Sequence, residues 1–194
     1  MNNKGTLWIA RTGLMLALLV VAQFVGSKLI PAGAVILGPM SITQLITGSL
    51  VNMILILTAA VVGVWSGIAV GVLSSVLALV LGIQGQVILT PAIALGNVII
   101  VLVTWFFFSL AARRGQKAYG VFGIVGIAAG AALKYTFLWL TVPALLLLLA
   151  KLPSAVRHKM TVMFSFPQLI TALIGGALAL TVIPPIKKVL LRRV

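Results

Sequence analysis

The sequence of 194 residues contains no Asp, no Glu and no Cys, and it has a single histidine, His158. Without carboxylates the chain lacks the usual general acid–base pair and the acidic ligands of many metal sites. Without cysteine it has no disulfide, no thiolate nucleophile and no cysteine-based zinc site. One histidine cannot enclose a metal, and no GxxxxGK loop is present to bind the phosphates of ATP. We therefore expect no catalytic residues, no metal site, no cofactor and no ATPase activity.

Charge is also scarce, because only 7% of the residues are charged and all 14 of them are Lys or Arg. Soluble domains carry about a quarter charged residues, of both signs. Hydrophobic residues make up 62% of the chain, and its mean hydropathy is +1.31. This composition predicts one integral membrane domain over residues 1–194, with the lipid bilayer as its surroundings, no soluble domain and no nucleic-acid partner.

A transmembrane helix needs about 20 mainly apolar residues. Applied along the chain, this length predicts an all-α protein with six membrane spans, which are separated by turns rich in Gly and Pro. The predicted spans are Leu7–Ser27, Ser41–Val62, Gly67–Gly82, Pro91–Ala112, Tyr119–Val142 and Thr161–Ile183. The fifth apolar run continues to Ala150, so Pro143 either ends that helix or kinks it.

Positive residues near the ends of the spans predict the orientation, because cytoplasmic loops carry an excess of Lys and Arg. With six spans, nine cations fall on the side of the two termini and four on the other side. The nine are Lys4, Arg11, Arg113, Arg114, Lys117, Lys187, Lys188, Arg192 and Arg193, and the four are Lys28, Lys151, Arg157 and Lys159. This asymmetry predicts that both termini are cytoplasmic.

Several polar residues of the predicted helices fall at a similar depth. At about 1.5 Å of rise per residue, Asn97 lies roughly 9 Å below the outer end of its helix, Lys134 roughly 12 Å and Gln168 roughly 10 Å. Gln44 and Asn52 occupy the outer half of the second span. Since these residues come from four different spans, we expect a polar layer in the outer half that binds a small molecule.

Lys134 is the most informative member of this layer. A cation in mid-membrane costs about 2.5–3.5 kcal/mol, and the sequence offers no carboxylate to neutralise it. Either Lys134 contacts a substrate, or backbone carbonyls, water or snorkelling to the headgroups solvate it. The neighbouring Tyr135 and Trp139 are candidates for the same pocket. Arg157 lies in the segment 151–159, which is either a lid or a solvated connection.

Small residues mark the first span, where Ala10, Gly13 and Ala17 form a narrow strip near the cytoplasmic end. Small strips let a second helix approach closely. The strip therefore either packs within the protein or docks a partner protein.

Four segments carry a resemblance to a known family. They are Ile46–Asn52 (ITGSLVN), Pro91–Asn97 (PAIALGN), Leu133–Tyr135 (LKY) and Phe166–Ala172 (FPQLITA). With the predicted spans, they resemble the substrate-binding S components of energy-coupling factor (ECF) vitamin transporters. The resemblance implies a non-enzymatic subunit of a prokaryotic plasma membrane, which captures a vitamin outside and docks on a transmembrane coupling protein with two cytoplasmic ATPases.

Within this family the chain looks most like the pantothenate-specific members. Pantothenate is a small anion with hydroxyl and amide groups, which suits a pocket that holds Lys134, Asn97 and Gln168. S components for pyridoxine, hydroxymethylpyrimidine or cobalamin are alternatives, as is a self-sufficient small solute carrier. The family commonly docks through an Ala-xxx-Ala strip on its first helix, and Gly13-xxx-Ala17 departs from that pattern only conservatively.

Overall fold

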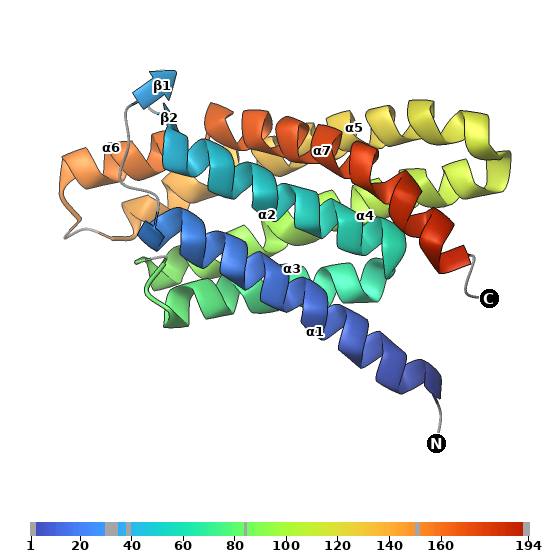
Figure 1. The fold of residues 1–194 in the computed structure, drawn as a ribbon. Helices are drawn as coiled ribbons and strands as arrows, with labels where there is room; N and C mark the ends of the chain where they lie inside the picture. The colour runs from blue at the N-terminus through green and yellow to red at the C-terminus, as the bar shows by residue number, and fades with distance from the viewer. Residues whose placement is uncertain (1–2, 30–34, 38–39, 84, 150–151, 192–194) are drawn as a thin grey trace.

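The computed structural model describes residues 3–29, 35–37, 40–83, 85–149 and 152–191, which form a helical bundle (Figure 1). Its long helices are α1 (Asn3–Phe24), α2 (Ile42–Val61), α3 (Val64–Val80), α4 (Thr90–Arg114), α5 (Gln116–Leu147) and α7 (Phe166–Leu191), and α6 (Ser154–Met163) is shorter. A π-helix η1 (Val25–Leu29), a small antiparallel pair β1 (Val35–Leu37) and β2 (Met40–Ser41), and a 3-10 turn η2 (Val87–Leu89) complete the described elements. The predicted all-α class is confirmed.

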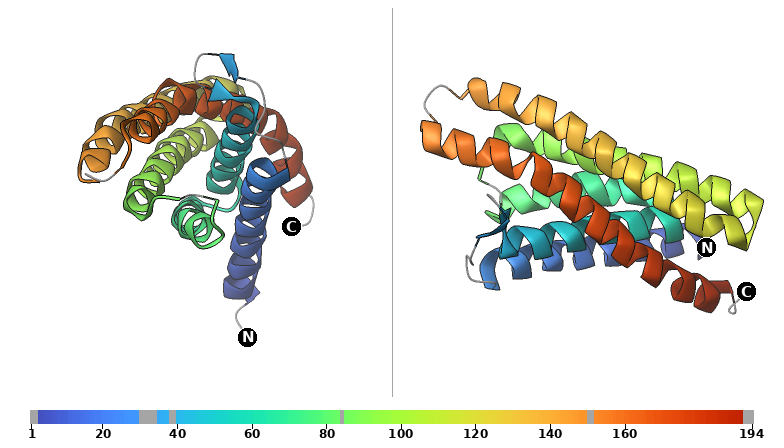
Figure 2. Two further views of the ribbon diagram at one scale, coloured as in Figure 1. Left: turned by 90° about the vertical axis from the view of Figure 1, so that its left-hand side faces the viewer. Right: turned by 90° about the horizontal axis from the view of Figure 1, so that it is seen from above.

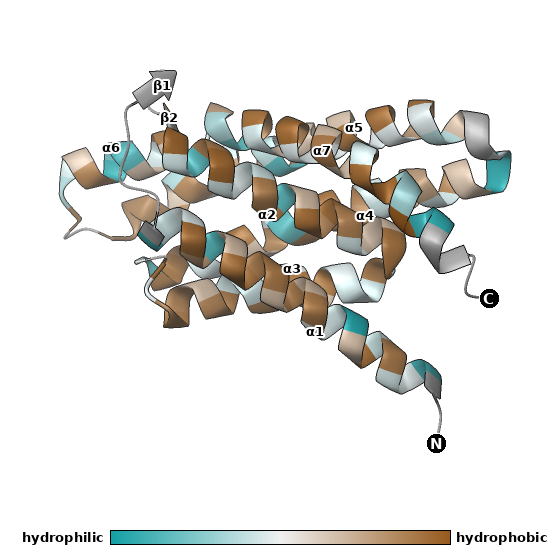
Figure 3. Ribbon diagram, in the orientation of Figure 1, coloured by the Kyte–Doolittle hydropathy of each residue, from teal (hydrophilic) through white to brown (hydrophobic). Residues whose placement is uncertain are grey.

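Among the described residues, five stretches are long and apolar enough to cross a bilayer. They are Lys4–Lys28, Ile42–Val61, Val87–Arg114, Ala118–Leu147 and Ser154–Lys188. The predicted third span corresponds to α3, an apolar helix of 17 residues, which at 1.5 Å per residue is about 26 Å long. Hydrophobic residues predominate along the long helices (Figure 3), and many large ones are exposed, among them Ile9, Val80 and Leu140. Such a surface suits the hydrocarbon core of a membrane, which is about 30 Å thick.

The structure determines two helix boundaries that the sequence left open or placed wrongly. Pro143 does not end the fifth helix, since α5 continues to Leu147 with Val142 and Leu146 fully buried on either side of the proline. The predicted start of the last span at Thr161 was wrong, because Thr161 belongs to α6. The chain turns after α6, where the Ser165 amide donates to the carbonyl of Val162 at 3.1 Å, and α7 starts at Phe166.

The first turn of α1 and the last turn of α7 lie at the same end of the bundle, which we call the terminal end (Figures 1 and 2). The β1–β2 pair, α6 and η2 lie at the opposite end, which we call the hairpin end. This arrangement agrees with the predicted placement of both termini on one side. The basic residues at the end of α4 and near the end of α7 are at the terminal end.

The core forms where α2 packs against α7 and α4. Its fully buried side chains include Leu55, Ile56, Ile100 and Val101. The contact between α2 and α7 is close because Gly175 has no side chain: a Cβ there would meet the Ser49 carbonyl oxygen, and it would lie 2.8 Å from the Met53 nitrogen. Backbone atoms cannot move aside as a flexible side chain does, so Gly175 sets the spacing of the two helices.

We expect Gly175→Ala to lower the free energy of unfolding by about 1–3 kcal/mol, because the new methyl group forces α2 and α7 apart. Gly120→Ala is the matched control, since a Cβ at Gly120 on α5 meets nothing within 4 Å. Alanine is the better helix former, so the control is expected to be neutral or to stabilise by up to about 1 kcal/mol. Denaturation of the two purified variants in detergent compares them, and equal stabilities would contradict the role of Gly175.

Candidate functional site

A cavity of about 350 Å³ lies at the hairpin end of the bundle, and α1 to α7 all contribute to its lining or its edge. Its polar lining residues are Gln23, Thr47, Asn52, Ser75, Gln86, Asn97, Lys134 and Gln168. Its apolar lining residues are Val51, Ala78, Ile83, Leu89, Ile93, Leu138, Met160, Met163 and Phe164. A largely apolar wall with a few polar groups is typical of a site for a small molecule, and the volume is within the usual range of about 300–1,000 Å³.

Lys134 of α5 is the only cationic residue among those that line the cavity within the described part of the chain, and only 3% of it is exposed. Its Nζ donates to Oδ1 of Asn52 on α2 at 2.7 Å and to Oδ1 of Asn97 on α4 at 2.9 Å. Three helices therefore converge on one ammonium group. Two side-chain amide oxygens therefore solvate the ammonium.

Each asparagine is itself fixed by its amide nitrogen. Nδ2 of Asn52 donates to the Gly48 carbonyl at 2.8 Å, and Nδ2 of Asn97 donates to Oγ of Ser75 at 3.2 Å. These bonds orient both Oδ1 atoms toward Lys134. An ammonium has three protons, and the two amides accept two of them, so one donor remains for a molecule in the cavity.

The charge that favours an anion at the hairpin end is that of Lys134. The amino termini of α2, α4 and α7 lie at this end with partial positive charges, but the carboxyl termini of α1, α3 and α5 lie there too, with partial negative charges. Ser41 caps α2, since its hydroxyl accepts from the Gln44 amide at 3.1 Å. Because the sequence contains no Asp or Glu, no carboxylate side chain can offset the charge of Lys134.

Two glutamines of the predicted polar layer bind the same backbone atom. Nε2 of Gln44 donates to the Met163 carbonyl at 2.8 Å, and Nε2 of Gln168 donates to it at 3.3 Å. Gln168 also lines the cavity, whereas Gln44 is not among the lining residues. The two side chains tie the end of α6 to α2 and α7, so Gln44 supports the site from outside it.

Three further candidates lie away from the cavity wall. Tyr135 and Trp139 stack on each other, with ring centroids 6.4 Å apart, and Trp139 is 51% exposed. A helix turns by 100° per residue, so the residue that shares the cavity face with Lys134 is Leu138, one turn further on. Arg157 donates instead to the carbonyl of Leu149, at 3.2 Å.

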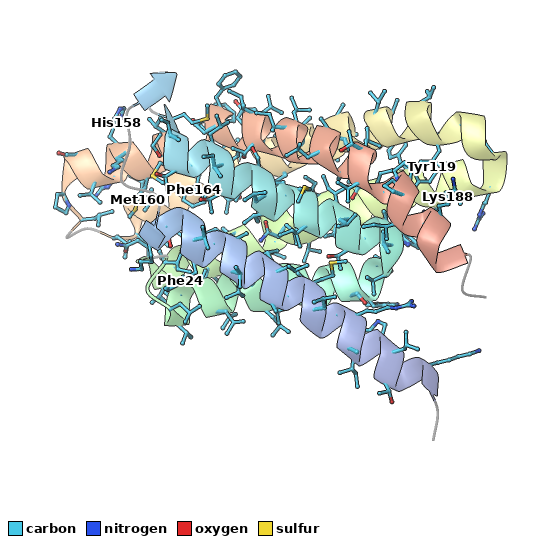
Figure 4. All side chains as sticks on the ribbon, viewed as in Figure 1. Phe24, Tyr119, His158, Met160, Phe164 and Lys188 are labelled. Atoms are coloured by element: carbon cyan, nitrogen blue, oxygen red, sulfur yellow. The ribbon has the colours of Figure 1, made fainter. Side chains whose placement is uncertain are left out.

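The segment 151–159, which was predicted to be a lid or a solvated connection, contributes most of its described residues to α6. Met160 and Phe164 lie at the hairpin end (Figure 4), where both line the cavity together with Met163. Sequence reasoning missed these three residues, although their i, i+3, i+4 spacing indicates one apolar helical face. It also missed Ser75 and Thr47, which are short polar residues within apolar helices.

The small strip of α1 faces away from the bundle. Ala10, Gly13 and Ala17 are all exposed, and a Cβ at Gly13 would meet nothing within 4 Å. The opposite face of α1 carries the internal contacts, such as the 2.8 Å hydrogen bond between the hydroxyls of Thr12 and Ser66. The strip is therefore not used for packing within the described chain.

Comparison with known proteins gives one match. A family model described as "ECF transporter, substrate-specific component" matches residues 8–187, which is nearly the whole chain. The comparisons with curated proteins and with solved structures gave no significant match. The family match agrees with the apolar helices and with a cavity suited to a small molecule. The chain belongs to the substrate-specific components of ECF transporters, which are membrane-embedded transport subunits rather than enzymes.

Proposed function

We propose that this chain is the pantothenate-binding subunit of an ATP-driven ECF importer in a prokaryotic plasma membrane. In this proposal the six apolar helices α1, α2, α3, α4, α5 and α7 cross the membrane, both termini are cytoplasmic, and the hairpin end faces outward. The vitamin enters the cavity at the hairpin end, and ATP is consumed by two partner ATPases that a transmembrane coupling protein connects to this subunit.

The observation that carries the proposal is the ammonium of Lys134, which Asn52 and Asn97 hold at the cavity wall. Since no side chain of this protein can supply a negative charge, a bound anion is the natural counter-charge. A charge-assisted hydrogen bond to a carboxylate is about twice as strong as a neutral one. The pantothenate carboxylate meets this requirement.

The size and chemistry of the cavity also support pantothenate over the alternative vitamins. A volume of about 350 Å³ suits a molecule of the size of pantothenate, and cobalamin is several times larger. Pyridoxine and hydroxymethylpyrimidine would fit by size, but neither carries a carboxylate for Lys134. Pantothenate is therefore the candidate that uses both the charge and the apolar wall.

Isothermal titration calorimetry of the purified chain against these four vitamins tests the proposal. We expect saturable binding of pantothenate with one site per chain, and markedly weaker or no binding of the other three. Tight binding of a neutral vitamin in preference to pantothenate would overturn the assignment. Binding of none of them would favour a structural subunit in which Lys134 is solvated only internally.

A self-sufficient solute carrier is the alternative from another functional class. Reconstitution of the chain alone into proteoliposomes distinguishes it from a binding subunit. We expect pantothenate binding without concentrative uptake, because the sequence has no ATP-binding loop and no acidic residue to couple protons. Sustained accumulation without a partner would contradict the proposal.

A further inference from the structure

Two basic side chains at the terminal end lie over aromatic rings of α5. The guanidinium of Arg114, the last residue of α4, is 5.0 Å from the ring centroid of Phe122. On α7, Nζ of Lys187 is 4.7 Å from the ring centroid of Tyr119, which also stacks on Phe108 of α4 at 5.3 Å. Because Tyr119 and Phe122 are three residues apart, α5 holds a cation from each of two neighbouring helices within about one turn.

These cations have no counter-charge in the protein. The sequence contains no Asp or Glu, and within the described part of the chain neither Arg114 nor Lys187 donates a hydrogen bond to another residue. An aromatic face attracts a cation without pairing all of its N–H groups, so donors of both side chains remain for an anion. The adjacent Arg113 and Lys188 are exposed, and Figure 4 shows Lys188 and Tyr119 at this end. The ends of α4 and α7 thus present four cations that no carboxylate side chain neutralises.

Apolar surface begins beside these charges. Val121 and Ile124 of α5 are 64% and 61% exposed, and Phe106 of α4 is 53% exposed. Ile124 is five residues beyond Tyr119, which is about 7.5 Å along the helix axis. A soluble anion gains nothing from this apolar surface. An anionic phospholipid fits both features, because its phosphate suits the cations and its acyl chains suit the apolar side chains.

We propose that Arg113, Arg114, Lys187 and Lys188 bind the head group of an anionic phospholipid, whose acyl chains lie along the exposed apolar side chains of α5. The rings of Tyr119 and Phe122 hold two of the cations in place before the lipid binds, which reduces the conformational entropy lost on binding. With both termini cytoplasmic, the lipid belongs to the inner leaflet. The inference goes beyond the proposed function, because this surface lies at the end of the bundle opposite the cavity.

Native mass spectrometry of the purified chain in detergent tests the inference by titration with phosphatidylglycerol or with phosphatidylcholine of the same acyl chains. Phosphatidylcholine has no net charge, so phosphatidylglycerol should bind the natural protein more tightly. Each basic residue near an anionic head group contributes a factor of about 5 in affinity. The Arg114→Gln, Lys187→Gln double variant should therefore bind its first phosphatidylglycerol about 25-fold more weakly, with little change for phosphatidylcholine.

The Lys28→Gln, Lys159→Gln double variant is the matched control. It removes the same number of charges at the hairpin end, where both side chains are exposed and neither lines the cavity. We expect its affinity for the first phosphatidylglycerol to equal that of the natural protein. Should loss of the ring contacts unfold the Arg114→Gln, Lys187→Gln variant, the Arg113→Gln, Lys188→Gln variant removes the exposed pair instead and should also lose phosphatidylglycerol affinity.

Several results would overturn the inference. Equal binding of the two lipids by the natural protein would refute a charged lipid site, and equal losses in both double variants would indicate an effect of net charge alone. Displacement of phosphatidylglycerol by glycerol 3-phosphate at similar affinity would assign the surface to a soluble phosphate. If the terminal-end variant kept its lipid affinity but no longer co-purified with the partner subunits, the surface would bind a protein.

The same variants keep this inference separate from the proposed function. Arg114 and Lys187 do not line the cavity, so calorimetry should show unchanged pantothenate binding in their double variant. A natural protein that selects phosphatidylglycerol but binds no vitamin would refute the proposed function alone. One that binds pantothenate without selecting between the lipids would refute the lipid site alone.

Discussion

Lys134→Met should weaken pantothenate binding by about 30-fold or more. Loss of one partner of a buried charged contact costs about 2–5 kcal/mol, and each 1.4 kcal/mol corresponds to a factor of ten in affinity. Methionine retains much of the apolar stem of lysine, and the amide nitrogens of Asn52 and Asn97 keep their own acceptors. We therefore expect the variant to insert and fold, with the loss visible in calorimetric titration.

The analogue in which the pantothenate carboxylate is an amide completes this test. It should lose much affinity for the natural protein and far less for Lys134→Met, since only the natural protein offers the ammonium. Lys159→Met is the control, because Lys159 is an exposed cation of α6 that does not line the cavity. If the analogue loses the same affinity relative to pantothenate in Lys134→Met as in the natural protein, Lys134 does not bind the carboxylate. The helix amino termini and Arg157 would then be the better candidates.

Gly13→Leu or Ala17→Leu should abolish assembly with the coupling protein and the uptake that depends on it. Both positions are exposed on α1, and a leucine there prevents the close helix–helix approach that small residues permit. Pantothenate binding by the isolated subunit should remain, because the cavity lies at the opposite end of the bundle. Co-purification with the partner subunits and uptake of labelled pantothenate measure the effect.

Gly120→Leu provides the control for this experiment. Gly120 is an exposed glycine of α5 with open space around it, so the same change of side chain is made on a different face. We expect assembly and uptake to be retained. Equal loss of vitamin binding and assembly in Gly13→Leu would show that the strip of α1 stabilises the subunit itself.

The sequence predicted how deep the site lies along the helices better than it predicted which way each side chain points. Rise per residue placed Asn97 and Lys134 at similar depths, and the structure joins them by a hydrogen bond of 2.9 Å. Depth alone cannot say which way a side chain points. Tyr135 and Trp139 were placed in the pocket because they are close to Lys134 in sequence, whereas helical rotation turns them away from the cavity wall.

The sequence did not predict helix α6, for a different reason. Its ten residues include Arg157, His158 and Lys159, so a search for long apolar runs sees only a charged connection. Pro143 was ambiguous because a proline inside a helix removes one hydrogen bond, and only the packing of its neighbours decides whether the helix continues. In both cases tertiary contacts, which no local pattern contains, determine the outcome.

The shared carbonyl of Met163 sets an energy scale for the attachment of α6 to α2 and α7. Moving α6 away from α2 and α7 breaks the bonds from Gln44 and Gln168 together, since both end on one oxygen. Two neutral bonds contribute about 1–3 kcal/mol net, which corresponds to a closed-to-open ratio of about 5 to 150. Met160 and Phe164 also pack against the buried cluster that holds Leu138, Val142 and Leu146, so the two bonds are only the polar part of the free energy that keeps α6 in place.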